Sequence, residues 1–467
     1  MSAGEKSLGR RISRVIDDGF FPTSPAATLR EAIFSEILAG VLGSSPTTNE
    51  MGEVKTTFEA HEAVSDEVAD QVWDVFEATY TTTGARGARG KKAKRYIIPF
   101  HPTIAEHIQP HETRNWGKWY RMLMTSGDPP NFNRDLHEKF VSRLEGLEPS
   151  NLFEEVVVDI AAKIETDDIG EPATEPLRPY VNDCAELFQD DLRRWLQDEY
   201  DSPSNWLGST KDLFCFHFMM YYVQLALNLE REFSTLADDS RGYTPDTLPV
   251  HFGMWDEKAS KDRQFSQEWY ERDQRGIQGH VYDSWGRLSV LNVIAEVANE
   301  HTDHDLAALT VSEAMELPDE TRQKCIDKLR KYIDAPEQID TLPEAAQAMT
   351  RTVRSYYEGK KKLNQTPISM GVNVVRQLGD GGERKYWRTQ RKVGPTFRLN
   401  RGALRFFARL FTMDEDDTHY DEFVSYLERR GIYIDSQSNN RALEELDGMG
   451  MIDRQSDSGG AVYVRSL

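Results

Sequence analysis

The most informative segment for the fold is LFCFHFMMYYVQLALNL, residues 213–229 of this 467-residue chain. The run is apolar on every face of a helix, which predicts a helix that is covered on all sides. It is long enough to suggest a membrane span, but His217, Gln224 and Asn228 lie inside it and no second run of this kind follows. The sequence therefore predicts a fully buried core helix and no membrane partner.

Around this helix, most of the chain shows the apolar spacing of three and four residues that is typical of helices. One apolar segment, LPVHFGMW (248–255), predicts a strand instead. We therefore expect a mainly α protein with a multi-helix body and a few short strands. Helices are predicted near 29–42, 65–80, 132–146, 151–164, 179–199, 211–232, 284–300, 318–334 and 343–358.

The C-terminal segment differs from the body. Three short helices are expected from FRLNRGALRFFARLF (397–411), HYDEFVSYLERRG (419–431) and SNNRALEELDGMG (438–450), and two strand-like pieces follow. Three helices followed by a hairpin are typical of a winged helix. The predicted organisation is an N-terminal helical region with a basic loop (1–95), a helical core domain (96–377), and a basic linker with a winged-helix-like domain (378–467).

The chain is strongly acidic, with 78 Asp and Glu against 56 Lys and Arg and a formal net charge of −22. Dense carboxylates keep a protein hydrated where salt screens ordinary repulsion, so this composition predicts a halophilic source. Cys184, Cys215 and Cys325 stand far apart without a CxxC pair, as in a reducing compartment. The N-terminus, MSAGEKSLGRRISR, lacks the apolar core of a signal peptide, and so we expect a cytoplasmic protein.

Basic residues gather in one part of this acidic chain. Between Arg351 and Arg409 there are fifteen Lys or Arg and three acidic residues, and a second cluster, GARGARGKKAKR (84–95), has no acidic residue. Such clusters are typical of a surface that contacts the DNA backbone, although ion pairs or docking on the protein's own acidic body are alternatives. The predicted DNA-binding residues are Arg384, Lys385, Arg388, Arg391, Lys392, Arg398, Arg401 and Arg405.

Two patterns define this predicted surface. In GGERKYWRTQRKVG (381–394), Tyr386 and Trp387 stand among cations, and flat rings beside cations suit single-stranded or distorted DNA. Arginines spaced by three and four residues would also share one face of the first C-terminal helix. These arginines are Arg398, Arg401, Arg405 and Arg409.

Motifs for enzyme chemistry are weak. No phosphate loop of the Walker type is present, so ATP-driven work is assigned to another protein. Asp246, Asp256 and Lys258 satisfy the loose PD-(D/E)xK pattern, in which two carboxylates hold Mg²⁺ and a lysine steadies the attacking water. The alternative function is therefore a magnesium-dependent nuclease.

The histidines in EHTDHD (300–305) and near 101–111 have no matching second cluster, and we expect no bound metal or other cofactor.

Two segments, MMYYVQLALNLEREF (219–233) and LPVHFGMWDEKASKDR (248–263), resemble the DNA phosphorothioation-dependent restriction protein DptG family. Members carry an apolar helix ending in QLALNL, then a strand and a charged EKxSxxR segment. That segment corresponds here to Glu257, Lys258, Ser260 and Arg263. The resemblance implies a component of an antiviral defence system that acts on DNA lacking phosphorothioate marks, together with ATPase or helicase subunits.

These observations favour a non-enzymatic subunit of a DNA restriction or anti-phage complex, which contacts the DNA backbone and ATPase partners. The nuclease is the first alternative, and a pure protein–protein adaptor is the second. The charged segment after the predicted strand is interpreted first as a structural contact that anchors a neighbouring element or partner, and second as a metal site.

Overall fold

The computed structural model describes residues 30–45, 51–61, 64–65, 69–83, 95–107, 116–164, 167–168, 174–197, 203–236, 243–258, 260, 262–268, 276–301, 309–333, 339–358, 374–380, 383–390, 394–413, 418–455 and 461–465. The fold is mainly α, as the sequence predicts. The basic loop at 84–94 lies outside the described residues.

The centre of the molecule is α10 (Pro203–Thr235), which at 33 residues is about 50 Å long. Every side chain from Asp212 to Ala226 is buried, because α2 (Arg30–Leu42), α9 (Asn182–Trp195) and α12 (Gly276–His301) pack around it. This confirms the predicted core helix. Within the described residues, no helix is long and apolar enough to cross a membrane.

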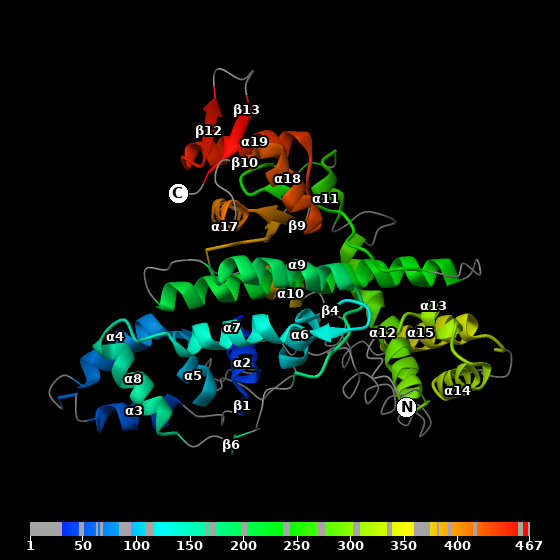
Figure 1. The fold of residues 1–467 in the computed structure, drawn as a ribbon, viewed down its shortest axis with the longest axis horizontal. Helices are drawn as coiled ribbons and strands as arrows, with labels where there is room; N and C mark the ends of the chain where they lie inside the picture. Colours follow the sequence, from blue (N-terminus) through cyan, green and yellow to red (C-terminus); the bar gives the residue numbers. More distant parts are fainter. Residues whose placement is uncertain are drawn as a thin grey trace.

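The N-terminal helices lie on one side of α10, and the C-terminal helices lie on the other (Figure 1). On the N-terminal side, α6 (Trp116–Leu123) and α7 (Arg134–Glu145) share the main apolar core with α10. A smaller separate core forms between α3 (Met51–Glu59), α4 (Ala69–Tyr80), α5 (Pro102–His107), α8 (Leu152–Ala162) and β3 (Arg95–Ile97). β3 pairs with β2 (Thr81–Thr83).

A further group of helices packs on α12. It consists of α13 (Val311–Met315), α14 (Asp319–Arg330) and α15 (Leu342–Glu358), and Figure 1 shows it beside one end of α10. Two short strand pairs lie among the helices of the N-terminal part, where they contact α2, α5, α6 and α9. They join β1 (Ser44–Ser45) to β6 (Asp167–Asp168) and β4 (Thr125–Ser126) to β5 (Asn131–Phe132).

A four-stranded sheet joins the body to the C-terminal segment. β7 (Val250–Met254) pairs in parallel with β11 (Ile432–Ile434) on one edge and with β9 (Gly394–Leu399) on the other. β8 (Trp387–Gln390) extends the sheet by pairing antiparallel with β9. The segment 378–395, expected to be a linker, instead contributes β8 and the start of β9, and its residues Leu378, Tyr386 and Trp387 belong to the main core.

The predicted strand at 248–255 is confirmed as β7, and the three predicted C-terminal helices are present. They are α17 (Arg401–Thr412), α18 (Tyr420–Arg429) and α19 (Ser436–Gly448). A separate sheet has the order β10-β13-β12, formed by β10 (Thr418–His419), β12 (Ile452–Gln455) and β13 (Ala461–Val464). One apolar core runs across the boundary predicted at residue 378.

A buried ionic network connects α9, α10 and α18. The carboxylate of Asp191 accepts hydrogen bonds from Tyr426 (2.8 Å), from Nε of Arg430 (2.8 Å) and from His217 (2.9 Å), and it is fully buried. Burial alone would raise the pKa of Asp191, but the Arg430 guanidinium and the other donors hold it well below its usual range. The network therefore holds α18 on the body through a carboxylate that stays charged.

A second buried carboxylate, Glu232 of α10, accepts hydrogen bonds from Tyr180 and from the backbone N–H of Ser312 (3.2 Å). Burial raises the pKa of Glu232 from 4.5 to about 7, although these donors favour its charged form. Glu230, two residues earlier, is paired with His280 and Arg287. These partners lower the pKa of Glu230 from 4.5 to about 2.

We expect Asp191→Ala to lower the free energy of unfolding by about 3–5 kcal/mol, because it leaves the Arg430 guanidinium buried without its counter-charge. Chemical denaturation of the variant and of the wild type measures this difference in unfolding free energy. Asp190→Ala is the matched control, since Asp190 is exposed and pairs with Arg193 at the surface, and it should change stability by no more than about 0.5 kcal/mol. Equal effects of the two substitutions would contradict the role of the network.

We expect Glu232 to make stability depend on pH. Its pKa is higher in the folded chain than in the unfolded chain, so its stabilising contribution is complete below pH about 4.5 and is lost as the pH rises through about 7. The difference in unfolding free energy between the wild type and Glu232→Gln should fall by about 3 kcal/mol over this range. Glu230→Gln is the control and should not change in this window; a flat difference for Glu232→Gln would contradict the prediction.

Candidate functional site

Two side chains of α10 determine where β7 begins. Gln224 accepts a hydrogen bond from the backbone N–H of Leu248 (2.8 Å) and donates one to its carbonyl (2.7 Å). Asn228, one turn later, binds both peptide groups of Asp246 in the same way, at 3.0 and 2.9 Å. The QLALN motif therefore holds an extended segment against the helix, as a neighbouring strand would.

The charged residues after β7 hold a different element. Arg263 binds both carboxylate oxygens of Asp435 at 2.8 Å and donates to Glu257 at 3.0 Å. Glu257 also accepts a hydrogen bond from Ser438 (2.7 Å), and Asp435 is the N-cap of α19. The EKxSxxR segment is therefore a structural contact within the chain, whereas Lys258 and Ser260 are exposed.

The structure does not bring the candidate nuclease residues together. Asp246 precedes β7 and is held by α10, and Asp256 follows the strand at its other end. The ends of a five-residue strand are on the order of 13 Å apart, whereas a protein ligand stands about 2 Å from Mg²⁺. Among the described residues, no group of three or more His, Cys, Asp or Glu could hold a metal ion.

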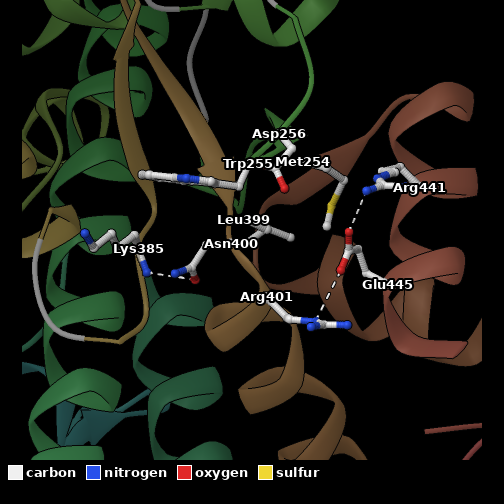
Figure 2. A pocket seen from close by; sticks show the side chains of 9 residues that line it. All are labelled: Met254, Trp255, Asp256, Lys385, Leu399, Asn400, Arg401, Arg441 and Glu445. Carbon is white, nitrogen blue, oxygen red and sulfur yellow. Dashed lines mark hydrogen bonds and ion pairs between the residues drawn. The ribbon is translucent and has the colours of Figure 1, made fainter. Parts of the chain in front are cut away.

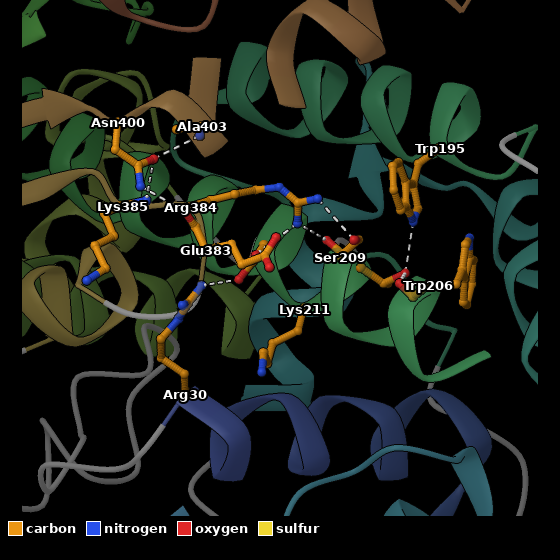
Figure 3. Close-up of polar contacts among 12 residues, drawn as sticks. Arg30, Trp195, Trp206, Ser209, Lys211, Glu383, Arg384, Lys385, Asn400 and Ala403 are labelled. Atoms are coloured by element: carbon orange, nitrogen blue, oxygen red, sulfur yellow. Dashed lines mark hydrogen bonds and ion pairs between the residues drawn. The ribbon is translucent and has the colours of Figure 1, made fainter. Parts of the chain in front are cut away.

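Two of the predicted DNA-binding arginines lie inside the protein. Arg384 donates to Asp212 (2.8 Å) and to Ser209 (3.0 Å), and Figure 3 shows it beside Ser209. Its guanidinium stacks on Phe406 at 4.3 Å. Arg398 belongs to β9, not to the following helix, and it is fully buried. Its guanidinium donates to the carbonyls of Met254 and Glu257, and burial lowers its pKa to about 10. The prediction that Arg384 and Arg398 are exposed to DNA is therefore wrong.

The aromatic residues of the same segment are also internal. Tyr386 and Trp387 are 0% and 2% exposed, so they cannot stack on bases without unfolding β8. Arg388 donates to the backbone carbonyl of Trp255 and lies over its ring at 5.3 Å. Arg391 and Lys392 lie outside the described residues.

Among the predicted residues that the structure describes, Lys385, Arg401 and Arg405 remain as candidates for a surface contact. Lys385 is half-buried and has its Nζ 5.9 Å from the centre of the Trp255 ring. Arg401 is 61% exposed and pairs with Glu445 at 3.3 Å, and Arg405 lies one turn further along the exposed face of α17. Neither Lys385 nor Arg405 forms an ion pair with any residue that the structure describes.

A pocket of about 460 Å³ lies where β7 and β9 end. Figure 2 shows Trp255 and Asp256 on one side of it, Arg401 on the opposite side, and the Arg441–Glu445 pair of α19 on a third. Leu399 and Asn400 lie between them. The carboxyl ends of parallel strands are a common place for ligand sites, and the volume falls in the range of small-molecule pockets.

Sequence reasoning missed most of this site. Trp255 is the last apolar residue of the predicted strand, so its pattern indicates burial and not a pocket wall. Arg441 and Glu445 are four residues apart and read as an ordinary helical ion pair, which they also form, at 2.8 Å. Only the pairing of β7 with β9, which places Trp255 beside Lys385, brings these residues together.

No protein-family model matches the chain, and no curated protein matches it. The resemblance to the DptG family therefore stays a prediction.

We expect Arg263→Leu to lower the free energy of unfolding by about 2–3 kcal/mol, because Glu257 and Asp435 then lose their shared partner in a mostly buried site. The matched control is Lys258→Ala in the same motif, which should change stability by less than about 0.5 kcal/mol because Lys258 is exposed. Chemical denaturation distinguishes the two. A large effect of Lys258→Ala with none from Arg263→Leu would refute the assignment of this motif to structure.

Proposed function

We propose that this protein is a non-enzymatic subunit of a DNA restriction or anti-phage complex, which contacts the DNA backbone through Lys385 and through the basic face of α17, formed by Arg401 and Arg405. The observation that carries the proposal is the grouping of Lys385, Arg401 and Arg405 at the surface of a molecule with a net charge of −22. Lys385 and Arg405 form no ion pair with the described residues, and Arg401 pairs with Glu445 but is 61% exposed. Cations at the surface of a protein are available to a polyanion.

The DNA-contacting set is smaller than the sequence predicts. Arg384 and Arg398 support it only indirectly, because they position the hairpin that carries Lys385. Asn400 adds to this arrangement, since its side-chain oxygen accepts from the backbone N–H groups of Lys385 (3.0 Å) and Ala403 (2.9 Å). One side chain thus sets the hairpin and the start of α17 relative to each other.

The order of elements supports a winged-helix-like assignment of the C-terminal part. Helices α17, α18 and α19 are followed by the β12–β13 hairpin, and the short strand β10 after α17 pairs with β13. In the third helix, α19, Arg441 forms ion pairs with both Glu444 and Glu445. We therefore assign phosphate contacts to α17 and make no base-reading assignment to α19.

Membership of a phosphorothioation-linked defence system rests on the resemblance of residues 219–233 and 248–263 to the DptG family. These segments have a structural role, through the contacts of Gln224, Asn228, Glu257 and Arg263. A role of this kind requires no catalytic activity. The ATPase or helicase partners belong to the same proposal. Cleavage of plasmid DNA with Mg²⁺ that Asp256→Ala abolishes would instead favour the nuclease.

We expect the double variant Arg401→Gln, Arg405→Glu to bind duplex DNA on the order of tenfold or more weakly at low salt. Because two phosphate contacts are lost, the slope of log affinity against log salt should also fall by about 2. Fluorescence anisotropy over a series of salt concentrations measures both quantities.

The matched control is the double variant Lys163→Gln, Lys139→Glu. Both lysines are exposed, and each forms an ion pair with an aspartate four residues earlier in the chain, as ordinary surface cations do. This control should retain the wild-type affinity and slope. Identical curves for both double variants would refute the DNA-contacting face, and co-purification of an ATPase without any DNA binding would favour the adaptor.

A further inference from the structure

The pocket between β7, β9, α17 and α19 adjoins the basic face of α17. Arg401 belongs to both, since its side chain lines the pocket and Arg405 follows one turn later on the exposed side of the helix. A DNA strand whose phosphates contact these two arginines would therefore pass the mouth of the pocket.

The charge of the pocket favours an anion. Three cations, Lys385, Arg401 and Arg441, line it together with two carboxylates, Asp256 and Glu445. Glu445 is shared by two guanidinium groups, at 3.3 Å from Arg401 and 2.8 Å from Arg441, so its charge is already balanced. Lys385 has no carboxylate partner among the described residues. The side of the pocket near Lys385 and Arg401 is thus positive.

The wall of the pocket beside Lys385 suits a flat, uncharged group. Trp255, which follows the buried strand β7, is only half-buried, and Figure 2 shows its ring beside Lys385, across the pocket from Arg401. Leu399 and Met254 are buried and supply apolar surface behind it. Asp256 is exposed at the rim, where its carboxylate can accept hydrogen bonds from an exocyclic amine.

We infer that this pocket receives one unpaired nucleotide of a DNA strand, with its base stacked on Trp255 and its phosphate between Lys385 and Arg401. Stacking on an aromatic ring together with cations along the backbone is how proteins bind single strands. The inference rests on the proposed function, because the strand is held at α17 before a nucleotide can enter. It adds a preference for strand ends or unpaired positions over continuous duplex.

The test compares a blunt duplex with the same duplex carrying a short single-stranded overhang. We expect the wild type to bind the overhang duplex about tenfold more tightly. Trp255→Leu should lose this preference, and Trp255→Tyr should keep it because a ring remains. Both variants should bind the blunt duplex as the wild type does, and thermal unfolding of each confirms that it is folded.

The outcomes separate the two proposals. Equal affinity of the wild type for both duplexes, or a preference that Trp255→Leu retains, overturns the nucleotide pocket and leaves the phosphate-contacting face of α17 in place. No binding of either duplex at any salt concentration overturns the proposed function. Equilibrium dialysis with deoxyadenosine monophosphate alone should show no saturable binding; saturation that Trp255→Leu abolishes would assign the pocket to a free nucleotide, not to DNA.

Discussion

The structure depends on β7, a buried strand whose two edges pair with strands from the far end of the chain. Buried peptide groups must be hydrogen-bonded, and β7 finds its partners in β9 and β11. Gln224 and Asn228 fix its start against α10, and Arg263 ties the segment after it to α19. The body and the C-terminal helices are consequently parts of one packed unit, and removing the chain from β9 onward would leave both edges of β7 without partners.

Helices were predictable from the sequence because their apolar spacing is local. The core helix around residues 213–229 is the clearest case, since no side of it is polar enough to face water. Strands β8 and β9 were not predictable in the same way, because GGERKYWRTQRKVG contains the glycines and charges of a loop and owes its structure to pairing with β7. A strand partner more than 130 residues away leaves no mark within the segment itself.

The positions of the arginines show the same limit at the level of side chains. A guanidinium has five donors, which carbonyl groups can satisfy as well as phosphates can. Arg398 uses the carbonyls at the end of β7, and Arg384 shares the Asp212 carboxylate with Arg30, which is 2.6 Å from it. Composition cannot separate these internal roles from the exposed role of Arg405. The cluster of cations was visible in the sequence. Which of these cations are internal and which are exposed depends on how the sheet forms.

The acidity of the molecule restricts how it can hold DNA. A net charge of −22 repels a polyanion at long range, and only high salt removes this repulsion, since the screening length is about 3 Å at 1 M. The same salt also weakens phosphate contacts, because releasing counterions from DNA then gains less free energy. In a halophilic cytoplasm, which the composition predicts, a few exposed cations would therefore give little affinity on their own. A contact that does not depend on salt, such as stacking on Trp255, is the kind of interaction that such a protein needs beside its cations.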